Sequence, residues 1–268
     1  MELRNRVCIV TGAASGIGRA GAIRFAAEGA KVVAADRDLA GVTETVAAIV
    51  GQGGTAMAVP CDVSKESDII AMVAKAEEMF GPIDLVWSNA GIGFGGGVEA
   101  PDREWQTIWD VNVMAHVWTA RAVLPKMIER GEGYLVSTAS AAGLLSNIGT
   151  ASYTVTKHAA VALAEWLAIT HGDQGIRVSC LCPQGVNTNM LSGMSAEGAS
   201  SAAASVKASG NVLEPSTVAQ YVVDAIRAEQ FLILPHPEVL TFWQRKTADI
   251  DRWLAGMRRL QAKVRRTP

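Results

Sequence analysis

The stretch TGAASGIGRA, residues 11–20, places Gly12, Gly16 and Gly18 at the end of a short apolar run. That run, VCIV at residues 7–10, is typical of a buried strand, and a helix-like pattern follows the glycines. The glycines therefore lie in a predicted strand-to-helix turn. Glycine permits positive φ angles and lets backbone N–H groups approach a ligand closely. Such a turn at a helix N-terminus favours an anion such as a pyrophosphate, although a purely structural tight turn has the same pattern.

Short β-rich apolar runs recur along the whole chain, with helix-length connections between them. Seven are found: VCIV (7–10), KVVAAD (31–36), TAMAVP (55–60), IDLVWSNAG (83–91), GYLVST (133–138), IRVSCLCP (176–183) and FLILP (231–235). This arrangement is typical of a parallel sheet covered on both sides by right-handed crossovers. The sequence therefore predicts one α/β domain over residues 1–268, with a doubly wound parallel sheet of about seven strands and helices on both faces. Ligands of such sheets bind beyond the carboxyl ends of the strands.

Composition and charge argue against several other classes of protein. The formal net charge is −2 and charged residues make up 19%, so no basic excess indicates nucleic acid or an anionic membrane surface. The N-terminal apolar run is too short for a signal peptide or a membrane span, and we expect a cytoplasmic protein. The cysteines lie in or beside predicted strands, without ligand spacing for a metal, so we expect neither a disulfide framework nor a metal site. They are Cys8, Cys61, Cys180 and Cys182.

An acidic residue follows the glycine turn at the end of the next predicted strand. Asp36 ends the second predicted strand, 18 residues beyond Gly18, close to the spacing at which an acid binds the adenosine ribose hydroxyls. An aspartate there repels a 2′-phosphate, which favours NAD over NADP. Arg37 follows directly and attracts such a phosphate, so NADP is kept as the less favoured alternative. The other interpretation of Asp36 is a helix or turn cap.

A tyrosine and a lysine lie one helical turn apart in TASYTVTKHAAVALAEWLA, where Tyr153 and Lys157 share a helix face. An ammonium group near the phenol stabilises the phenolate, and with the lysine and the cofactor charge together we expect a tyrosine pKa well below its reference of about 10. Tyr153 is then a candidate general acid/base. The spacing also suits a packed ring beside a solvated amine.

These motifs together resemble a known family. TGAASGIG at residues 11–18 matches TGxxxGxG, and YTVTK at residues 153–157 matches YxxxK, both of the classical short-chain dehydrogenase/reductase family. SNAG at residues 88–91 resembles the family's NNAG, with Ser88 in place of the first asparagine. The resemblance extends from about Arg6 to Pro235. It implies a Rossmann-type fold and a nicotinamide-dependent oxidoreductase that interconverts a secondary alcohol and a ketone.

The resemblance also implies roles for individual residues. Ser140 holds the substrate oxygen, Tyr153 exchanges its proton, and Lys157 binds the nicotinamide ribose and lowers the tyrosine pKa. Asn112 resembles the family asparagine that supports a proton-relay water. In CPQGVNTNM, which resembles the segment that closes over the nicotinamide, Gln184 replaces a usual glycine. The implied cofactor contacts are Gly12, Ser15, Gly16, Ile17, Gly18, Asp36, Arg37, Asp62, Val63, Asn89, Ala90, Gly91, Tyr153, Lys157, Pro183, Val186 and Thr188.

Two further segments bear on the substrate. Residues 189–213 are expected to form a lid, and residues 241–268 a C-terminal helical segment that packs on the body or on a sister subunit of a homotetramer or homodimer. The apolar residues near the catalytic and lid segments predict a small hydrophobic alcohol or ketone, of hydroxysteroid, acyl or aromatic type. They are Leu144, Leu145, Ile148, Met190, Leu191 and Met194. The alternative is that these side chains only pack a lid shut.

Three other functions are weighed. A 3-oxoacyl thioester reductase needs a basic patch at the cleft mouth, and Arg121 and Lys126 are weak candidates for one. Polyol oxidation does not suit an apolar lid. A nucleotide-binding sensor or scaffold without turnover does not suit intact Ser140, Tyr153 and Lys157.

Overall fold

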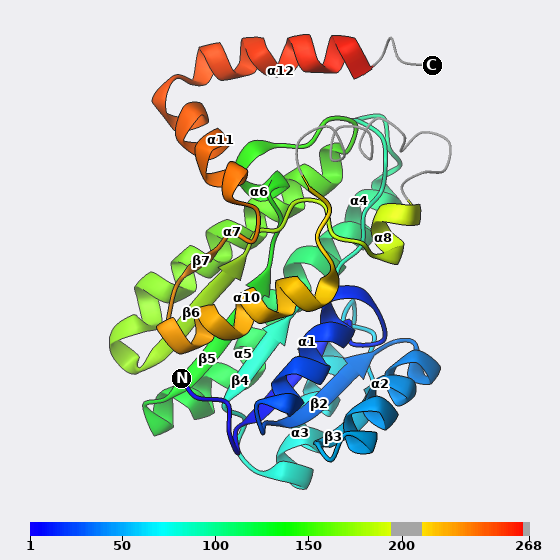
Figure 1. Ribbon diagram of the computed structural model, residues 1–268, viewed down its shortest axis with the longest axis vertical. Helices are drawn as coiled ribbons and strands as arrows, with labels where there is room; N and C mark the ends of the chain where they lie inside the picture. Colours follow the sequence, from blue (N-terminus) through cyan, green and yellow to red (C-terminus); the bar gives the residue numbers. More distant parts are fainter. Residues whose placement is uncertain (194–210, 265–268) are drawn as a thin grey trace.

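The strands of the computed structural model, which describes residues 1–193 and 211–264, form one parallel sheet in the order β3-β2-β1-β4-β5-β6-β7 (Figure 1). They are β1 Val7–Thr11, β2 Lys31–Asp36, β3 Thr55–Pro60, β4 Leu85–Ser88, β5 Gly133–Thr138, β6 Ile176–Leu181 and β7 Leu232–Ile233. The chain first moves outward from β1 to β3 and then returns to place β4 on the other side of β1. This confirms the prediction of a doubly wound parallel sheet of about seven strands.

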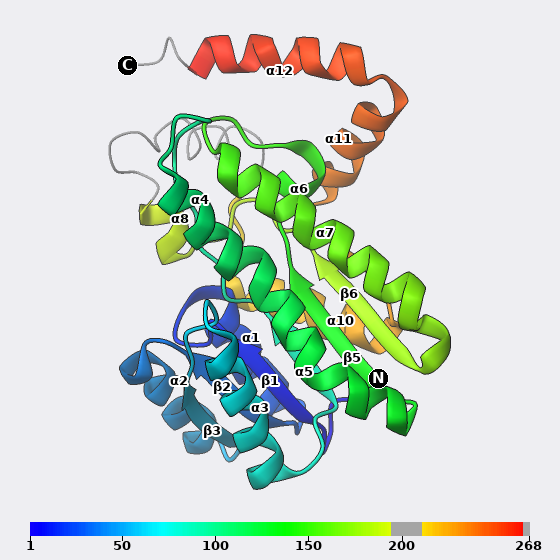
Figure 2. The same ribbon diagram turned by 180° about the vertical axis from the view of Figure 1, so that it is seen from behind.

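The helices cover both faces of this sheet. They are α1 Gly16–Ala27, α2 Leu39–Gly51, α3 Glu66–Phe80, α4 Asp102–Trp109, α5 Ala115–Arg130, α6 Ala142–Leu145, α7 Ala151–His171, α8 Asn189–Gly193, α10 Pro215–Ala228, α11 Pro237–Ala248 and α12 Ile250–Val264. A π-helical turn, η1, covers Asp110–Met114, and a 3₁₀ turn, η2, covers Gly172–Gln174. Helices α1, α2 and α10 lie on one face (Figure 1) and α3, α5 and α7 on the other (Figure 2).

The central strand β1 shows why both faces are apolar. Side chains alternate along a strand, so Cys8 and Val10 join the core that contains Phe25 of α1, while Ile9 joins the opposite core with Met72 of α3. All five side chains are buried. A continuous apolar run, rather than an alternating one, is therefore the pattern that this double-sided sheet requires.

The C-terminal segment forms two helices instead of one. Helix α11 ends at Ala248, and the Asp249 carboxylate accepts a hydrogen bond from the Arg252 backbone N–H at 3.0 Å, which caps the start of α12. The rings of Phe242 and Trp253 pack with their centroids 6.4 Å apart and join the two helices. Both helices lie beyond the carboxyl ends of the strands (Figure 1).

The expected lid falls only partly within the structure. Helix α8, Asn189–Gly193, and residues 211–213 are described, whereas residues 194–210, with Met194, lie outside the described residues, as do residues 265–268. In the described ranges, no helix is both long enough and apolar enough to cross a membrane.

Candidate active site

A cavity of about 610 Å³ opens at the carboxyl ends of the strands. Loops that follow β1, β2, β3, β4, β5 and β6 all contribute to its wall, together with α7, α8, α11 and α12. The cavity brings together most of the side chains that the sequence singled out. These are Gly12, Ser15, Gly16, Ile17, Asp36, Arg37, Asp62, Val63, Asn89, Ala90, Gly91, Ser140, Tyr153, Lys157, Pro183, Val186 and Thr188.

The glycine turn forms one end of the cavity. Gly12 has φ +69° and Gly16 has φ +53°, in the left-handed region that favours glycine. Gly18 does not line the cavity. Instead, a Cβ at Gly18 would lie 2.1 Å from the Gly12 carbonyl oxygen, so this glycine lets α1 pack closely under the turn. The N-terminus of α1 consequently points its first backbone N–H groups at the cavity.

Asp36 lies at the end of β2 and is a turn cap as well as a cavity residue. Its Oδ2 accepts from the Ala14 backbone N–H at 3.0 Å, and its Oδ1 accepts from the Asp38 N–H at 3.0 Å. These two bonds fix the carboxylate beside the glycine turn. Arg37, the next residue, is exposed and also lines the cavity. The structure therefore places both the acid and the competing cation of the sequence argument at this end.

Asp62 follows β3 and is fixed in a similar way. Its Oδ1 accepts from the Ser64 N–H at 3.1 Å and from the Ser64 hydroxyl at 2.7 Å, and Lys65 lies 3.4 Å from Oδ2. Val63 beside it is buried and lines the cavity. This loop thus offers one acidic and one apolar side chain to the same end of the cavity as Asp36.

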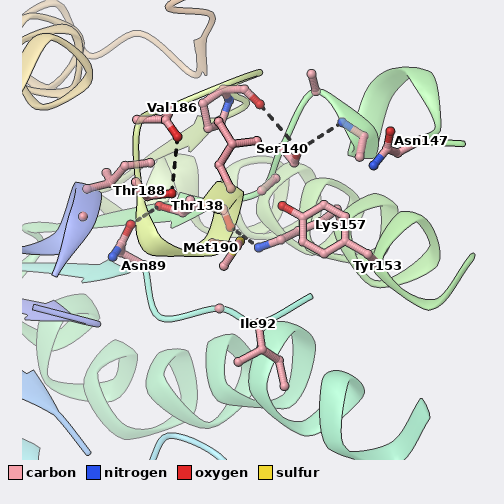
Figure 3. A pocket seen from close by; sticks show the side chains of 18 of the residues that line it. Asn89, Ile92, Thr138, Ser140, Asn147, Tyr153, Lys157, Val186, Thr188 and Met190 are labelled. Carbon is pink, nitrogen blue, oxygen red and sulfur yellow. Dashed lines mark hydrogen bonds between the residues drawn. The ribbon is translucent and has the colours of Figure 1, made fainter. Parts of the chain in front are cut away.

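Asn89 joins three neighbouring strands behind the cavity. Its Nδ2 donates to the Thr11 carbonyl at 3.0 Å, and its Oδ1 accepts from the Thr138 hydroxyl at 3.1 Å (Figure 3). The Thr138 hydroxyl accepts in turn from the Trp87 indole at 2.8 Å. Because these partners lie on β1, β4 and β5, the network holds the strand ends in register where the cavity begins.

Tyr153 and Lys157 point from α7 toward the cavity, with the Lys157 Nζ 5.6 Å from the centre of the tyrosine ring (Figure 3). Nζ donates a hydrogen bond of 2.9 Å to the Thr138 carbonyl. Lys157 is only 2% exposed, and burial lowers its pKa from 10.5 to about 8, against the opposing effect of Cys180 and Cys182. Lys157 therefore stays mainly protonated at neutral pH, although its pKa is lower than that of a solvated lysine.

Burial raises the pKa of Tyr153 above its usual value of 10.0, and a hydrogen bond with Ser140 opposes the rise. The groups of the protein alone therefore do not lower this pKa, because desolvation disfavours the phenolate. The expected fall also depends on the charge of the cofactor, so it stays a prediction for the complex with the cofactor.

Ser140 lies just beyond β5, between the tyrosine and the loop that follows β6 (Figure 3). Its hydroxyl oxygen accepts from the Ala142 backbone N–H at 3.1 Å, and the hydroxyl lies 3.5 Å from the Pro183 carbonyl. These contacts orient the hydroxyl into the cavity beside Tyr153. A hydroxyl and a phenol that face one cavity suit the binding of a single alcohol or carbonyl oxygen.

Asn112 lies behind the cavity wall. It belongs to the π-helical turn η1 and is fully buried. Its Oδ1 accepts from the Ile92 N–H at 3.0 Å, and its Nδ2 donates to the Ile92 carbonyl at 2.9 Å and to the Thr156 hydroxyl at 3.2 Å. A Cβ at Gly91 would lie 3.3 Å from both the Asn112 Oδ1 and the Lys157 Nζ. The side chain thus fixes the backbone of the β4 loop beside the lysine.

The loop after β6, where Gln184 departs from the family pattern, is held by a residue that the sequence analysis missed. His236, buried at the start of α11, accepts from the Gln184 backbone N–H at 3.1 Å through Nδ1. Its Nε2 donates to the Gly185 carbonyl at 3.0 Å. The two bonds assign one tautomer and fix the Pro183–Val186 wall of the cavity. Nothing in the local sequence around His236 indicates this distant partner.

The C-terminal helices also contribute residues to the cavity wall, which the sequence did not predict. The expected packing on the body occurs at Phe242, Trp243 and Trp253, which contact the apolar core on one face of the sheet, and α11 and α12 in addition line the outer part of the cavity. The side chains concerned are Phe242, Arg245, Trp253, Met257 and Leu260. The helical spacing of Trp253, Met257 and Leu260 is visible in the sequence, but the sequence does not show which surface these side chains face. Of the expected apolar set, Leu145, Met190 and Leu191 line the cavity, and Leu144 is buried beneath it.

No group of three or more histidine, cysteine, aspartate or glutamate side chains that could hold a metal ion occurs among residues 1–193 and 211–264. The four cysteines are buried and free, with the Sγ atoms of Cys180 and Cys182 3.9 Å apart. The chemistry of the cavity therefore has to be argued from its hydroxyl, phenol, amine and carboxylate groups.

Comparisons with known proteins agree with this geometry. The family model described as short chain dehydrogenase matches residues 6–198. The chain is 35% identical to the 1-deoxy-11-beta-hydroxypentalenate dehydrogenase of Streptomyces exfoliatus, over 89% of this chain and 86% of that one. It is 38% identical to the meso-2,3-butanediol dehydrogenase of Serratia marcescens, over 72% and 76%. A short chain dehydrogenase/reductase from Burkholderia phymatum, solved in complex with NAD, superposes with a TM-score of 0.85 at 33% identity and covers 94% of this chain and 96% of that one.

Proposed function

This chain belongs to the short-chain dehydrogenase/reductase family, whose members act as oxidoreductases on alcohols and ketones with NAD(P), and from that premise we propose that it interconverts a hydrophobic secondary alcohol and its ketone with NAD. One observation carries the proposal. A single cavity joins the glycine turn, the Ser140–Tyr153–Lys157 group and an apolar outer wall. The three parts correspond to cofactor binding, proton transfer and recognition of an apolar substrate.

The cavity fits a nicotinamide dinucleotide. Gly12 and Gly16 line the cavity without side chains, and a Cβ at either would press on the neighbouring Ala90 or Thr188, at 2.9 Å from the Ala90 Cα and 3.0 Å from the Thr188 Cγ2. We assign the pyrophosphate to this turn and the adenosine ribose to Asp36. When bound, the nicotinamide supplies the hydride acceptor or donor.

The remaining chemistry belongs to this chain's own residues. In oxidation, Ser140 donates a hydrogen bond to the substrate oxygen, and the Tyr153 Oη takes the hydroxyl proton; reduction reverses both steps. The Lys157 ammonium, 5.6 Å from the centre of the tyrosine ring, stabilises the phenolate form of Tyr153. We assign Asn112 a positioning role, through its bonds to Ile92, on the loop that contains Gly91.

The NAD preference rests on the fixed carboxylate of Asp36. A 2′-phosphate at the end of β2 would meet this negative charge, although Arg37 lies next to it. We expect kcat/KM with NAD to exceed that with NADP by roughly tenfold or more, and Asp36→Ala to reduce the ratio by a similar factor. Asp38→Ala is the matched control, because Asp38 caps α2 through the Gly41 N–H and does not line the cavity. A wild-type preference for NADP would reject this part of the proposal.

The hydrophobic substrate class rests on the outer wall. Leu145, Met190, Phe242, Trp253 and Met257 surround the space beyond Ser140 and Tyr153. A series of secondary alcohols of increasing apolar size, assayed by NADH formation, should show a rising kcat/KM. A flat series, or a preference for the smallest polyol, would contradict a hydrophobic substrate.

A second candidate is the reduction of a 3-oxoacyl thioester. The basic side chains that favour it in the structure differ from those considered from the sequence. Arg121 and Lys126 are engaged by Glu66 and Glu77 of α3, so they do not form the required patch. Exposed basic side chains do occur on α12, beside the cavity: Arg252, Arg258 and Arg259. Acetoacetyl-coenzyme A, tested with NADH and NADPH, separates the candidates, because only a thioester reductase should prefer it over free ketones.

A further inference from the structure

One charged side chain interrupts the apolar outer wall of the cavity. Among the described residues that line the cavity, the aspartate, lysine and arginine side chains are those of Asp36, Arg37, Asp62, Lys157 and Arg245. The first three lie at the glycine-turn end, and Lys157 lies against Tyr153. Arg245 projects from α11 and lies on the same wall as several apolar side chains: Leu145, Phe242, Trp253, Met257 and Leu260.

Arg245 has no acidic partner in the part of the chain that the structure describes. Other arginines of the body do: Arg6 pairs with Asp84 at 2.9 Å, and Arg177 pairs with Glu229 at 2.8 Å. The nearest acid along the chain, Asp249, instead uses its carboxylate to cap α12. Arg245 is thus an exposed side chain that lines the cavity and has no carboxylate partner among the described residues.

The position of Arg245 is fixed by its neighbours. The Lys246 ammonium donates to the Leu144 carbonyl at 2.6 Å, which ties α11 to α6 directly after Ser140. His236 fixes the first residues of α11 to the loop that follows β6. Arg245 therefore sits on a helix held at both ends against the walls that carry the catalytic hydroxyl, and not on a free terminal tail.

We infer that Arg245 binds a carboxylate of the substrate, and that the substrate is an amphiphilic hydroxy acid or its keto acid. The inference rests on the proposed function, because it places the reacting oxygen at Ser140 and Tyr153. The apolar body of the substrate then lies between Leu145 and Trp253, and its carboxylate accepts two parallel hydrogen bonds from the guanidinium. A neutral apolar molecule would offer this exposed guanidinium no acceptor, whereas a carboxylate adds a charge-assisted interaction.

A carboxylate fits the observations better than a coenzyme thioester. A thioester brings several phosphates, which several cations have to neutralise together. The basic side chains of α12 that would meet that need lie outside the cavity lining, whereas the outer wall of the cavity presents one arginine, Arg245; the other lining arginine, Arg37, lies at the glycine-turn end. One guanidinium beside apolar side chains matches one carboxylate on an apolar skeleton.

The test compares charged and uncharged forms of the same substrates. A panel of cyclic and chain hydroxy acids with secondary hydroxyls, each paired with its methyl ester, is assayed with the wild type, Arg245→Gln and the control Arg121→Gln. We expect the wild type to prefer the acids, and Arg245→Gln to lower kcat/KM for the acids by about 10- to 100-fold with little effect on the esters. Arg121→Gln, which changes an exposed arginine of α5 that pairs with Glu66, should leave both unchanged.

Binding gives a second readout that does not need turnover. Decanoate and decanol are titrated calorimetrically into the same three proteins in the presence of NADH. We expect Arg245→Gln to weaken decanoate binding by about 10- to 100-fold and to leave decanol binding unchanged. Equal losses for both ligands, or an unaltered affinity for decanoate, would overturn the carboxylate site.

The two proposals fail in different ways. If the esters and neutral alcohols are oxidised but the wild type does not prefer the acids, Arg245 has no carboxylate role and the dehydrogenase proposal stands. If decanoate binds through Arg245 but no alcohol, acid or ester is oxidised and no ketone is reduced, the carboxylate site stands and the proposed reaction is wrong. A preference for acetoacetyl-coenzyme A that Arg245→Gln does not alter counts against the carboxylate site.

Discussion

At the scale of single residues, Gly18 is the position where the cofactor turn tolerates no side chain. A Cβ there would lie 2.1 Å from the Gly12 carbonyl oxygen and 2.6 Å from the Asn89 Nδ2. Both neighbours are held in place, one by the backbone turn and the other by the bond from Asn89 to Thr11. The glycine requirement therefore comes from helix packing, and not from direct contact with the cavity.

Gly18→Ala should consequently damage both folding and cofactor binding. We expect the free energy of unfolding to fall by about 1–3 kcal/mol, as for other overpacked sites. Since α1 has to move away from the turn, the Kd for NADH should also rise. Urea unfolding and NADH fluorescence measure the two effects.

Gly51→Ala is the matched control, because nothing lies within 4 Å of a Cβ at that position of α2. It should change the free energy of unfolding by no more than about 1 kcal/mol, in the stabilising direction, and leave NADH binding unaltered. Equal behaviour of the two variants would show that the close contact under the turn is not real.

His116 makes the stability depend on pH. Burial, with a smaller effect of the Lys157 charge, lowers its pKa from 6.5 to about 3. The unfolded chain therefore binds one more proton than the folded protein between pH 3 and 6.5, and stability rises with pH through this window and is complete above it. The ring makes one contact, Nδ1 to the Ser137 hydroxyl at 3.3 Å, and its Nε2 has no hydrogen-bond partner among the described residues.

Replacement of His116 by leucine should make the free energy of unfolding depend less strongly on pH below neutrality. Between pH 6.5 and 4.5 the wild type should lose roughly 2 kcal/mol of unfolding free energy more than His116→Leu does. Chemical denaturation at a series of pH values measures the difference. Parallel curves for the two proteins would mean that the histidine is protonated in the folded state.

Single residues also mark where sequence reasoning succeeds and where it stops. The glycines and Asp36 are readable because their contacts are set by a turn and by strand spacing. The raised pKa of Tyr153 could not be predicted from the sequence, because it depends on how far the folded chain removes the phenol from water. His236 and Arg245 were missed because their partners or surroundings come from segments far away in the sequence, which only the folded chain brings together.

At the scale of elements, α11 and α12 extend the sheet-and-helix body and close the outer part of the cavity. The sequence predicted helix from Thr241, but the helix begins at Pro237 and the segment divides at Asp249. The dividing signal is a local aspartate cap, which a search for apolar spacing does not detect. What the apolar face of α12 contacts could not be predicted, because the same pattern suits a core, an interface or a cavity wall.

Deletion of residues 250–268 should separate cofactor binding from substrate recognition. Helix α12 packs on α11 and places Trp253 against the apolar core on one face of the sheet, so we expect a modest fall in the unfolding midpoint and a nearly unchanged NADH affinity. Loss of Trp253, Met257 and Leu260 should lower kcat/KM for a large apolar alcohol by roughly tenfold or more. 2,3-Butanediol is the control substrate, because a molecule of that size does not need this wall.

The two hydrogen bonds between His236, at the start of α11, and the loop after β6 give a further prediction. His236→Leu leaves the Gln184 N–H and the Gly185 carbonyl without their partner. We expect a loss of about 1–3 kcal/mol in the free energy of unfolding and weaker NADH binding, because the Pro183–Val186 wall is released. His171→Leu, at the surface end of α7, should stay within about 0.5 kcal/mol of the wild type. Similar losses in both variants would show that the His236 hydrogen bonds do not specifically stabilise the loop after β6.

At the scale of the whole molecule, the strand order determines where chemistry can occur. The chain reverses its direction of travel between β1 and β4, and the loops on either side of that reversal diverge to leave room for a ligand. Two apolar cores, one on each face of the sheet, hold this arrangement. The double-sided apolar strands made the architecture predictable from the sequence, whereas the substrate class depends on the C-terminal helices and was predictable only in outline.

The central claim is that one cavity binds a nicotinamide cofactor and uses Tyr153 for proton transfer. The most direct measurement compares wild type and Tyr153→Phe, by NADH binding and by NADH formation from secondary alcohols. We predict that the variant binds NADH as the wild type does and that its kcat falls by about 10²- to 10⁴-fold. Turnover by Tyr153→Phe at the wild-type rate would contradict the account, since the cavity would then act without its phenol.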